Sequence, residues 1–358
     1  MQARRLRALV LAAGLGTRLR PLTELVPKPL LPVTGVPILG HTLAQLAAAG
    51  CEAVAVNLHH LGDQIRRRFG DAIAGVPITW SEEPELLGTL GAFWPLREFF
   101  APADLVVLIN GDSLCPWPLR RLIRRHLAGG AKATLLLASR PAPEAFGGGV
   151  GIDRRGRIVS LWEGDPARNQ IDGEVARRYV FAGAHVFAPE LLEGIGPEKP
   201  GFGPQKADIV RDLYLPMLDA GQPLDSLVTS RRWHDLGTPQ RYLEAVVDCA
   251  RAGWPERLWR RSWISSEAGI GRGAKVRKSA VEAGAQVGER AQVERSVLLP
   301  GARVGKGSVV RESILGFGAE VPSGAWVERR IVMPQGAGFA PGSGDSIVGG
   351  SVFIPIAG

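Results

Sequence analysis

The stretch ALVLAAGLGTRLRPLTELVPKPLLPV, from Ala8 to Val33, decides the fold of this chain. It begins with an unbroken run of small and branched apolar residues, which predicts a central strand that is covered on both faces. Gly14 and Gly16 then end the strand, because glycine lets the backbone turn sharply. Without side chains at these positions, backbone N–H groups can approach an anion closely. The stretch therefore predicts a strand that leads into an anion-binding turn.

Two cations follow the glycines in the same stretch. Arg18 can bridge phosphate groups, and Thr17 beside it can cap the turn. Lys28 lies between Pro27 and Pro29, whose fixed φ angles stiffen the loop that aims its ammonium group. We therefore expect a rigid, cationic loop that is suited to a nucleoside triphosphate.

The string GLGTRLRPLT followed by PKPLLPV resembles the nucleotide-binding motif of the sugar-1-phosphate nucleotidyltransferases, also called NDP-sugar pyrophosphorylases. A G-x-G pattern alone is weak evidence, because most such patterns are simple tight turns. Here every defining position of the longer motif is present. The resemblance implies an enzyme that transfers a nucleotidyl group from an NTP to a sugar 1-phosphate and releases pyrophosphate.

The choice of substrates rests on the branch of the family that the chain resembles. We favour GTP and mannose 1-phosphate, because the guanylyltransferase branch of the family often carries a C-terminal β-helix and a similar base loop. A uridylyl- or thymidylyltransferase that acts on another sugar or amino-sugar 1-phosphate is an open alternative. A non-catalytic regulatory subunit that binds an NDP-sugar is a second one.

Downstream of this motif, strand patterns alternate with helical patterns. The alternation predicts an α/β fold with a Rossmann-like, mainly parallel sheet and helices on both faces. Helices are expected at 37–49, 61–69, 91–99 and 239–252, and strands at 53–57, 76–80, 105–109, 131–138, 150–162 and 179–187. We assign residues 1–255 to this nucleotidyltransferase domain.

Beyond residue 260 the chain changes character, and Gly and Val recur. The segments IGRGAKV, AQVGERAQV and ARVGKGSVV resemble hexapeptide repeats, whose fold is a left-handed parallel β-helix with the aliphatic residues inside. The expected inward residues are Ile270, Val276, Val281, Val287, Val293, Val304, Val309, Ile314, Val321 and Val327. We assign 260–358 to this domain, with the Gly- and Pro-rich tail as its cap. An irregular Gly-rich surface or a small sandwich is the alternative.

Two aspartates are the candidate metal ligands. Asp112 follows the apolar strand at 105–109, at the carboxyl end where ligands collect in parallel sheets. Asp235 lies in WHDLGTPQRY, which resembles the W-x-D-[IL]-G-T-P-x-x-Y segment of the family. The resemblance implies that both carboxylates share one Mg²⁺, a hard ion that prefers oxygen ligands. A turn residue or a helix cap is the purely structural alternative for each.

The resemblance also implies the remaining site residues. Arg18, Lys28 and Asp112 are expected to be catalytic. The expected nucleotide-binding positions are Leu11, Ala12, Ala13, Gly14, Gly16, Thr17, Arg18, Gly88 and Thr89.

The expected sugar-phosphate-binding positions are Glu163, Gly149 and Gly183. The family commonly has Glu-Lys-Pro at Glu163, whereas here Gly164 and Asp165 follow it. The lysine that would hold the acceptor phosphate is therefore missing, and Arg168, Lys199 or Lys206 are candidates to replace it.

Composition excludes several other classes of function. The chain has 358 residues and a formal charge of +8, yet its basic residues are dispersed and no nucleic-acid-binding motif occurs. The basic and apolar start imitates a secretory signal, but it runs into the phosphate loop, so we expect no cleavage. No segment approaches the roughly 20 apolar residues of a membrane span. The three cysteines are widely separated, lack metal-ligand spacing and leave one over if two pair, so we expect the reducing cytoplasm.

The histidines bear on the role of the repeats. All six lie before the repeat region, whereas hexapeptide-repeat acyltransferases commonly use a histidine base. We therefore expect no second enzyme there. Exposed β-helix coils often pair, so a homo-oligomer through this domain is an open expectation.

Overall fold

The computed structural model describes residues 4–161, 174–193, 206–252 and 262–356. Its contacts divide the chain into two compact units. The first unit comprises Met1–Gly14 and Leu39–Trp233, and the second comprises Leu15–Ile38 and His234–Gly358. The predicted cationic loop, with Arg18 and Lys28, thus belongs to the same compact unit as the C-terminal repeats. No helix in the described part of the chain is long and apolar enough to cross a membrane.

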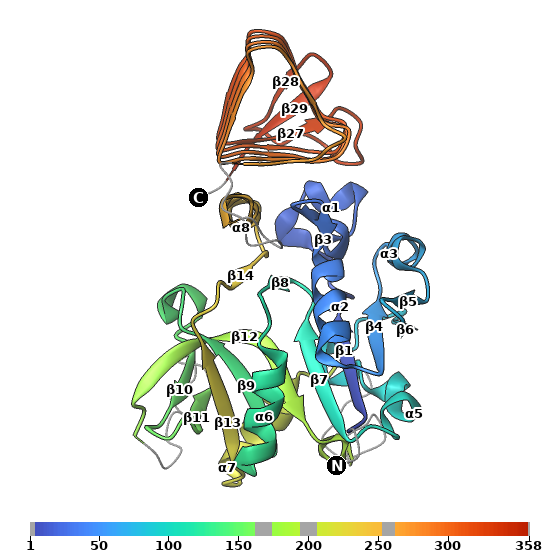
Figure 1. The fold of residues 1–358 in the computed structure, drawn as a ribbon, viewed down its shortest axis with the longest axis vertical. Coiled ribbons are helices and arrows are strands. Elements are labelled where there is room, and N and C mark those ends of the chain that lie inside the picture. Colours follow the sequence, from blue (N-terminus) through green and yellow to red (C-terminus); the bar gives the residue numbers. More distant parts are fainter. Residues whose placement is uncertain (1–3, 162–173, 194–205, 253–261, 357–358) are drawn as a thin grey trace. The chain divides into compact units, whose positions relative to one another are not determined.

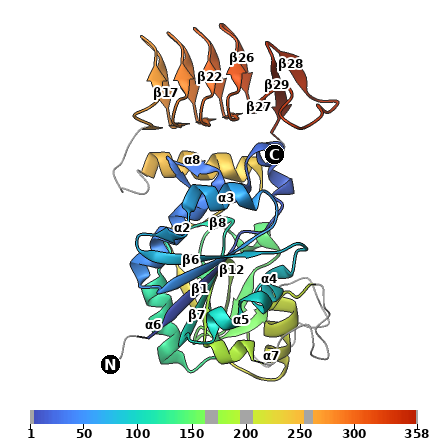
Figure 2. The same cartoon turned by 90° about the vertical axis from the view of Figure 1, so that its right-hand side faces the viewer.

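The first unit is built on a mixed sheet with a parallel centre (Figures 1 and 2). Strand β1 (Leu6–Leu11) lies between β4 (Ala53–Leu58) and β7 (Leu105–Asn110) and is parallel to both. β6 (Val76–Glu82) continues the parallel part beyond β4. β1, β4 and β7 are nearly continuous apolar runs, as expected of strands that are covered on both faces, whereas β6 is partly exposed. The predicted parallel centre of the α/β fold is confirmed.

Antiparallel pairing begins where the long strand β12 (Arg177–Phe187) joins β7. The remaining strands are β5 (Ala72–Ile73), β8 (Ser113–Leu114), β9 (Ala133–Ala138), β10 (Val150–Ile152), β11 (Ile158–Leu161) and β13 (Leu224–Thr229). β9 and β10 both pair antiparallel with β12, so β12 forks the sheet. A bulge between Phe181 and His185 marks the point where the pairing changes.

The helices of the first unit include those predicted at 37–49 and 61–69. They are α2 (Ile38–Ala49), α3 (Gly62–Phe69), α4 (Gly88–Gly91), α5 (Arg97–Phe100), α6 (Leu119–Gly129) and α7 (Leu215–Asp219), with a π-helical turn at Val210–Tyr214. The single helix predicted at 91–99 is wrong: α4, a 3-10 turn at Trp94–Leu96 and α5 replace it. Pro95 explains the break, because it cannot donate a helical hydrogen bond.

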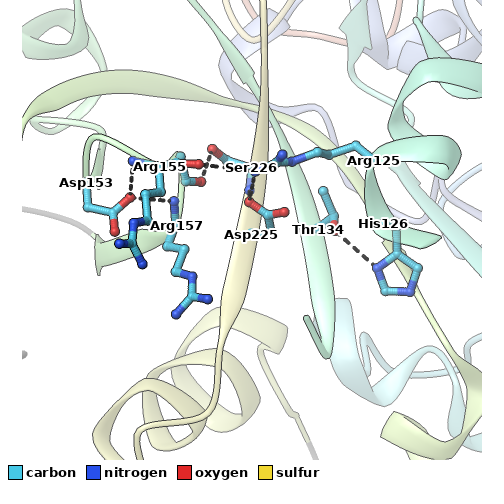
Figure 3. A network of polar contacts seen from close by, with 9 residues as sticks. Arg125, His126, Thr134, Asp153, Arg155, Arg157, Asp225 and Ser226 are labelled. Atoms are coloured by element: carbon cyan, nitrogen blue, oxygen red, sulfur yellow. Dashed lines mark hydrogen bonds and ion pairs between the residues drawn. The ribbon is translucent and has the colours of Figure 1, made fainter. Parts of the chain in front are cut away.

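A polar network joins α6 to the loop between β10 and β11 (Figure 3). Arg125 Nη2 donates to the buried Asp225 carboxylate on β13 at 2.7 Å. Beside it, the Ser226 hydroxyl donates to the Gly156 carbonyl at 2.7 Å, and Asp153 accepts two backbone N–H groups of the same loop. Arg125 therefore differs from its neighbours Arg120, Arg121 and Arg124, which are exposed.

His185 on β12 predicts a specific dependence of stability on pH. Its ring is buried, and Nδ1 lies 2.9 Å from the Tyr214 hydroxyl oxygen. Burial lowers the pKa of His185 to about 3. In the unfolded chain this histidine binds a proton as pH falls below about 6.5, whereas in the folded chain it stays neutral down to about pH 3. The free energy of unfolding is therefore unaffected by His185 above pH 6.5 and decreases as pH falls from 6.5 toward 3.

We expect His185→Gln to remove this loss, which amounts to at most about 1.4 kcal/mol per pH unit. Glutamine keeps a polar partner for Tyr214 but does not titrate. Urea unfolding from pH 7 to pH 4 measures the free energy of unfolding of both proteins. Parallel pH profiles for the variant and the parent would contradict the assignment.

The C-terminal part of the second unit is a left-handed parallel β-helix of triangular cross-section (Figure 1). One side contains β15 (Trp263–Ile264), β18 (Ala280–Val281), β21 (Val297–Leu298), β24 (Ile314–Leu315) and β27 (Arg330–Pro334). The second contains β16 (Gly269–Ile270), β19 (Gln286–Val287), β22 (Arg303–Val304) and β25 (Glu320–Val321). The third contains β17 (Lys275–Arg277), β20 (Gln292–Glu294), β23 (Val309–Arg311) and β26 (Trp326–Glu328).

Each coil of the β-helix contains 17 residues rather than three full hexads. Hydrogen bonds from the N–H of Ser296 to the Ser279 hydroxyl, and from the N–H of Ser313 to the Ser296 hydroxyl, repeat at this spacing. A six-residue count therefore drifts by one residue per coil. The interior positions of a coil are separated by six, six and five residues, and the five-residue step falls between Val310 and Leu315 rather than directly after Val304. The prediction that Val309 and Ile314 face inward is therefore wrong: Val310 and Leu315 belong to the interior cluster instead.

The other predicted inward positions are found in or against the interior cluster, apart from Ile270. Ile270 is 41% exposed because its coil is the first and has a neighbour on one side only. At the other end, β29 (Ser351–Pro355) pairs antiparallel with β27 and with β28 (Ser346–Val348).

The second unit also contains helix α8 and the loop that precedes α2. α8 (Pro239–Ala252) contacts β18 and β21. The loop contains a 3-10 turn at Thr17–Leu19, α1 (Leu22–Leu25), a 3-10 turn at Lys28–Leu30, and the hairpin of β2 (Pro32–Val33) and β3 (Val36–Pro37). β14 (His234–Asp235) precedes α8. The predicted helix at 239–252 is confirmed.

Candidate active site

The end of β1 in the first unit is held by a chain of buried polar side chains. The Ala12 N–H donates to Asn57 Oδ1 at 2.7 Å, and Asn57 Nδ2 donates to Glu83 Oε1 at 2.8 Å. The other oxygen of Glu83 accepts the N–H of Leu87 at 3.0 Å. Asn57 and Glu83 are each 3% exposed. This chain couples the predicted phosphate turn to the predicted base loop at residues 88 and 89.

Sequence reasoning missed Asn57 and Glu83. The available signal was their position: Asn57 lies in the strand next to β1, and Glu83 follows the strand after that. Buried polar residues at neighbouring carboxyl ends of a parallel sheet are expected to meet there.

Replacing Glu83 by glutamine should weaken nucleotide binding about ten-fold. The new amide group would point a donor at Asn57 Nδ2 or at the Leu87 N–H, so one of these two hydrogen bonds is lost. Titration with GTP and UTP measures the change in affinity. The neighbouring Glu82→Gln is the matched control, because Glu82 is exposed and pairs with Arg66. Equal nucleotide affinity in both variants would contradict this role.

The two glycines of the signature turn have different local requirements. Gly16 has φ +63°, and a Cβ there would lie 3.0 Å from Thr23 Cγ2. Gly14 has no protein atom within 4 Å of the position of such a Cβ. Packing against Thr23 therefore explains why residue 16 is a glycine. Among the described residues, no such contact exists at Gly14, whose backbone is accessible.

Asp112 lies directly beyond β7, where the backbone turns against the end of β1. The Gly111 N–H donates to the Leu11 carbonyl at 2.9 Å, and a Cβ at Gly111 would lie 2.5 Å from that oxygen. Only glycine allows this approach. The turn thus holds the half-buried Asp112 next to the strand end that carries Leu11 to Gly14.

The predicted base-loop residues are tightly packed on a distant segment of the first unit. Gly88 has φ +79°, and a Cβ there would lie 2.5 Å from the Ala207 carbonyl oxygen. The Thr89 hydroxyl donates to Asp208 at 3.0 Å and accepts the N–H of Ile209 at 2.8 Å. The hydroxyl hydrogen of Thr89 is thus already used. If Thr89 donates a hydrogen bond to a base, the donor is its backbone N–H.

In the second unit, Arg18 and Asp235 face the same small space. The position that a Cβ of Gly237 would take lies 2.9 Å from Asp235 Oδ1 and 3.0 Å from Arg18 Nη2. Asp235 also forms an ion pair with Arg241, a residue that the sequence reasoning missed although it lies in the quoted segment. Two guanidinium groups and one carboxylate are thus gathered beside Gly237, where a larger residue would collide with Asp235 and Arg18.

Lys28 begins the short 3-10 turn in the same loop and is 8% exposed. The Cβ of Lys28 lies 3.4 Å from the position that a Cβ of Gly16 would take. Thr23 also closes on this glycine, since its hydroxyl donates to the Gly16 carbonyl at 2.9 Å. The loop therefore folds on itself, as its rigid sequence predicts.

At the two predicted acceptor glycines, backbone conformation and packing inside the protein already require glycine. Gly149 has φ +72°, and a Cβ would lie 2.5 Å from the Tyr179 carbonyl oxygen. Gly183 has φ +82° at the bulge of β12 and packs against Asn110. Their contact with a sugar stays a prediction. Glu163, Arg168 and Lys199 lie outside the described residues, whereas Lys206 is described and exposed.

Comparison with known families identifies two matching families along the chain. Residues 7–252 match the model of the family described as "Nucleotidyl transferase", and residues 256–334 match one described as "GlmU-like, C-terminal hexapeptide". The chain belongs to the nucleotidyl transferase family. The first match spans the strand end at Leu11, the Asp112 turn and the pair of Arg18 and Asp235.

Individual members of the nucleotidyl transferase family are similar over the same region. A mannose-1-phosphate guanylyltransferase of Mycobacterium tuberculosis is 32% identical over 248 residues, covering 68% of this chain and 64% of that protein. A UTP–glucose-1-phosphate uridylyltransferase of Synechocystis is 29% identical over 253 residues, covering 67% and 62%. A mannose-1-phosphate guanylyltransferase catalytic subunit beta of Danio rerio is 29% identical over 265 residues, covering 71% and 68%. The chain thus spans somewhat less than two thirds of the first two relatives.

Nucleotidyl transferases generally use a divalent metal. Among the residues that the structure describes, no group of three or more His, Cys, Asp or Glu side chains could hold an ion by itself. The two predicted carboxylates, Asp112 and Asp235, supply hard oxygen donors. That they share one Mg²⁺ stays a prediction; carboxylate oxygens are the ligands that this ion prefers.

Proposed function

We propose that this chain transfers a nucleotidyl group from an NTP to a sugar 1-phosphate and releases pyrophosphate. The observation that carries the proposal is the gathering of Arg18 and Asp235 at Gly237 within a member of the nucleotidyl transferase family. A cation for phosphate and a carboxylate for a metal at one glycine are what this chemistry requires. Simple nucleotide binding needs no such carboxylate.

The main obstacle to the reaction is the repulsion between two phosphorylated substrates. An oxygen of the sugar phosphate attacks the α-phosphorus of the NTP, and the bond to the pyrophosphate oxygen breaks. Arg18 and Lys28 offset the negative charge on the departing pyrophosphate, and backbone groups from Leu11 to Gly14 orient the nucleotide. Catalysis then consists of alignment and charge stabilisation, with little covalent chemistry by the protein.

Asp112 and Asp235 are the residues that would hold the metal. A bound Mg²⁺ supplies neutralising charge at the phosphate oxygens. The ion pair of Asp235 with Arg241 orients this carboxylate, and the Gly111 turn fixes the backbone of Asp112. Contacts with neighbouring residues therefore restrict the position of each of the two aspartates.

For the substrates, we favour GTP and mannose 1-phosphate. Two of the relatives described above are named mannose-1-phosphate guanylyltransferases, which supports this choice. UTP with glucose 1-phosphate is the second candidate, because a uridylyltransferase acting on that sugar is similar at nearly the same identity. Transfer of a thymidylyl group, or transfer to an amino-sugar 1-phosphate, would be the same reaction with other substrates.

Pyrophosphate release with each NTP against a panel of sugar 1-phosphates tests both the reaction and the substrates. We expect the highest kcat/KM with GTP and mannose 1-phosphate in the presence of Mg²⁺. A preference for UTP and glucose 1-phosphate would keep the reaction but change the substrates. Silence with every pair, despite tight nucleotide binding, would favour a regulatory subunit. Retention of Arg18, Lys28, Asp112 and Asp235 supports the enzyme.

A further inference from the structure

The turn between β2 and β3 in the signature loop has an unusual backbone. Thr34 has φ +50° and Gly35 has φ +84°, so the two central residues of this hairpin are both left-handed. This geometry is typical of a two-residue hairpin turn. It also turns two successive backbone N–H groups toward one side, where they form a concave site for an anion.

The anion at this turn is a carboxylate of the β-helix. Glu282 Oε2 accepts the N–H of Gly35 at 3.1 Å, and its other oxygen lies 3.3 Å from the same nitrogen. The N–H of Thr34 also donates to this carboxylate. Glu282 is only 1% exposed. All three residues belong to the second compact unit.

Two further contacts hold the same hairpin. The indole of Trp263 lies so close to Gly35 that a Cβ there would be 2.7 Å from its ring. The buried hydroxyl of Tyr242 on α8 donates to the Pro32 carbonyl at 2.6 Å. The hairpin therefore contacts an aromatic ring, accepts a hydrogen bond from a hydroxyl and donates hydrogen bonds to a carboxylate, each from a different element.

The repeat itself does not require a carboxylate at position 282. One coil is 17 residues long, so the equivalent residues of the neighbouring coils are Ser265, Leu299 and Gly316. The N–H groups of Glu282 and Leu299 make equivalent hydrogen bonds to the carbonyls of Leu298 and Leu315. Leu299 is fully buried at its position. Glu282 thus departs from the pattern of the coils where the hairpin meets them.

Burying this carboxylate is costly for the folded chain. Desolvation raises the pKa of Glu282 to about 7, and the hydrogen bonds from Gly35 and Thr34 lower it only in part. A buried charge is weak evidence for a gain in stability, because an apolar residue of similar size often serves better. The two N–H donors of the turn are what this carboxylate specifically satisfies.

We infer that Glu282 is a positioning residue: through it, the β-helix holds the loop that carries Arg18 and Lys28. The inference rests on the proposed function. Only Pro29 to Leu31 separate Lys28 from the hairpin, and Leu31 is fully buried and accepts the N–H of Ile38. Fixing Gly35 therefore limits the freedom of Lys28. On this account the repeat domain supports the nucleotidyl transfer of its own chain, without chemistry of its own.

The test compares Glu282→Gln with Glu289→Gln in the full-length protein. Glutamine is nearly isosteric but turns one acceptor into a donor that faces a backbone N–H. Glu289 lies on the exposed surface of the β-helix and pairs with Lys306, so it controls for the loss of charge. Tyr242→Phe, which removes a second grip on the hairpin, is the additional variant if Glu282→Gln does not fold.

Amide hydrogen exchange and kinetics are the measurements. We expect the amides of Thr34 and Gly35 to exchange about ten-fold faster in Glu282→Gln, because they lose hydrogen bonds to a charged group. We expect kcat to fall about ten-fold, with the KM for the sugar 1-phosphate and the melting temperature nearly unchanged. A merely structural role would change the melting temperature and leave kcat unaltered.

Unchanged exchange, or faster exchange with parental kcat, would overturn the inference. The proposed function is judged separately, by pyrophosphate release in the parent. If the parent releases none, the affinity for GTP and UTP decides the role of Glu282. About ten-fold weaker binding in the variant would then support it, and equal affinity, or no binding by either protein, would overturn it.

Discussion

Replacing Asp112 by asparagine should lower kcat roughly a thousand-fold while the protein stays folded. The side chain is half-buried beyond β7, and the turn before it is held by the Gly111 hydrogen bond to Leu11. Asparagine preserves this backbone and the volume of the side chain. It removes the negative charge, which is what a divalent cation needs from this position. Pyrophosphate release at saturating substrates measures the loss.

Asp104→Asn is the matched control, because Asp104 precedes the same strand that Asp112 follows. Its carboxylate pairs with Arg5 at the opposite end of β7. We expect this variant to retain parental activity. Circular dichroism should give native spectra for both variants. Parental turnover in Asp112→Asn would remove Asp112 from the metal site and would leave Asp235 without its proposed partner.

Replacing Arg18 by glutamine should lower kcat/KM for the NTP by about 10²- to 10³-fold. The guanidinium faces the space at Gly237 that it shares with Asp235, and it is the group proposed to stabilise the departing pyrophosphate. Glutamine is shorter and uncharged, so this stabilisation is lost. Initial rates over a range of NTP concentrations measure the effect.

Arg20→Gln separates the loss of this group from the loss of any positive charge in the loop. Arg20 is exposed and pairs with Glu24 at 2.9 Å within the same segment. We expect Arg20→Gln to change kcat/KM by less than about two-fold, since exposed ion pairs contribute little. Similar losses in both variants would show that general electrostatic attraction, rather than the position of Arg18, explains the role of the loop.

The sequence was sufficient for features that depend on local pattern. The strand before Gly14, the helix over 239–252 and the parallel coils all follow from hydrophobic periodicity and glycine placement. The quoted motifs were also sufficient for the family, which the match over residues 7–252 shows. Each of these features is encoded within one continuous segment.

The features that sequence did not predict depend on contacts between distant segments. Glu83 gains its role only when Asn57 and Leu87 come beside it, and Glu282 only when the hairpin at Gly35 meets the coil. The inward position of Val310 depends on where the five-residue step of each 17-residue coil falls, which the local pattern does not show. Such contacts are long-range packing, so no local propensity records them.

Transfer of label from an NTP is the most direct test of the central claim. The protein is first given GTP labelled at the α-phosphate with mannose 1-phosphate, and then α-labelled UTP with glucose 1-phosphate. We predict that the label appears in an NDP-sugar. A γ-label should then leave as pyrophosphate in equal amount. If the γ-label is released as inorganic phosphate while the α-label stays in a nucleoside diphosphate, the chain hydrolyses nucleotides, and the proposed nucleotidyl transfer is wrong.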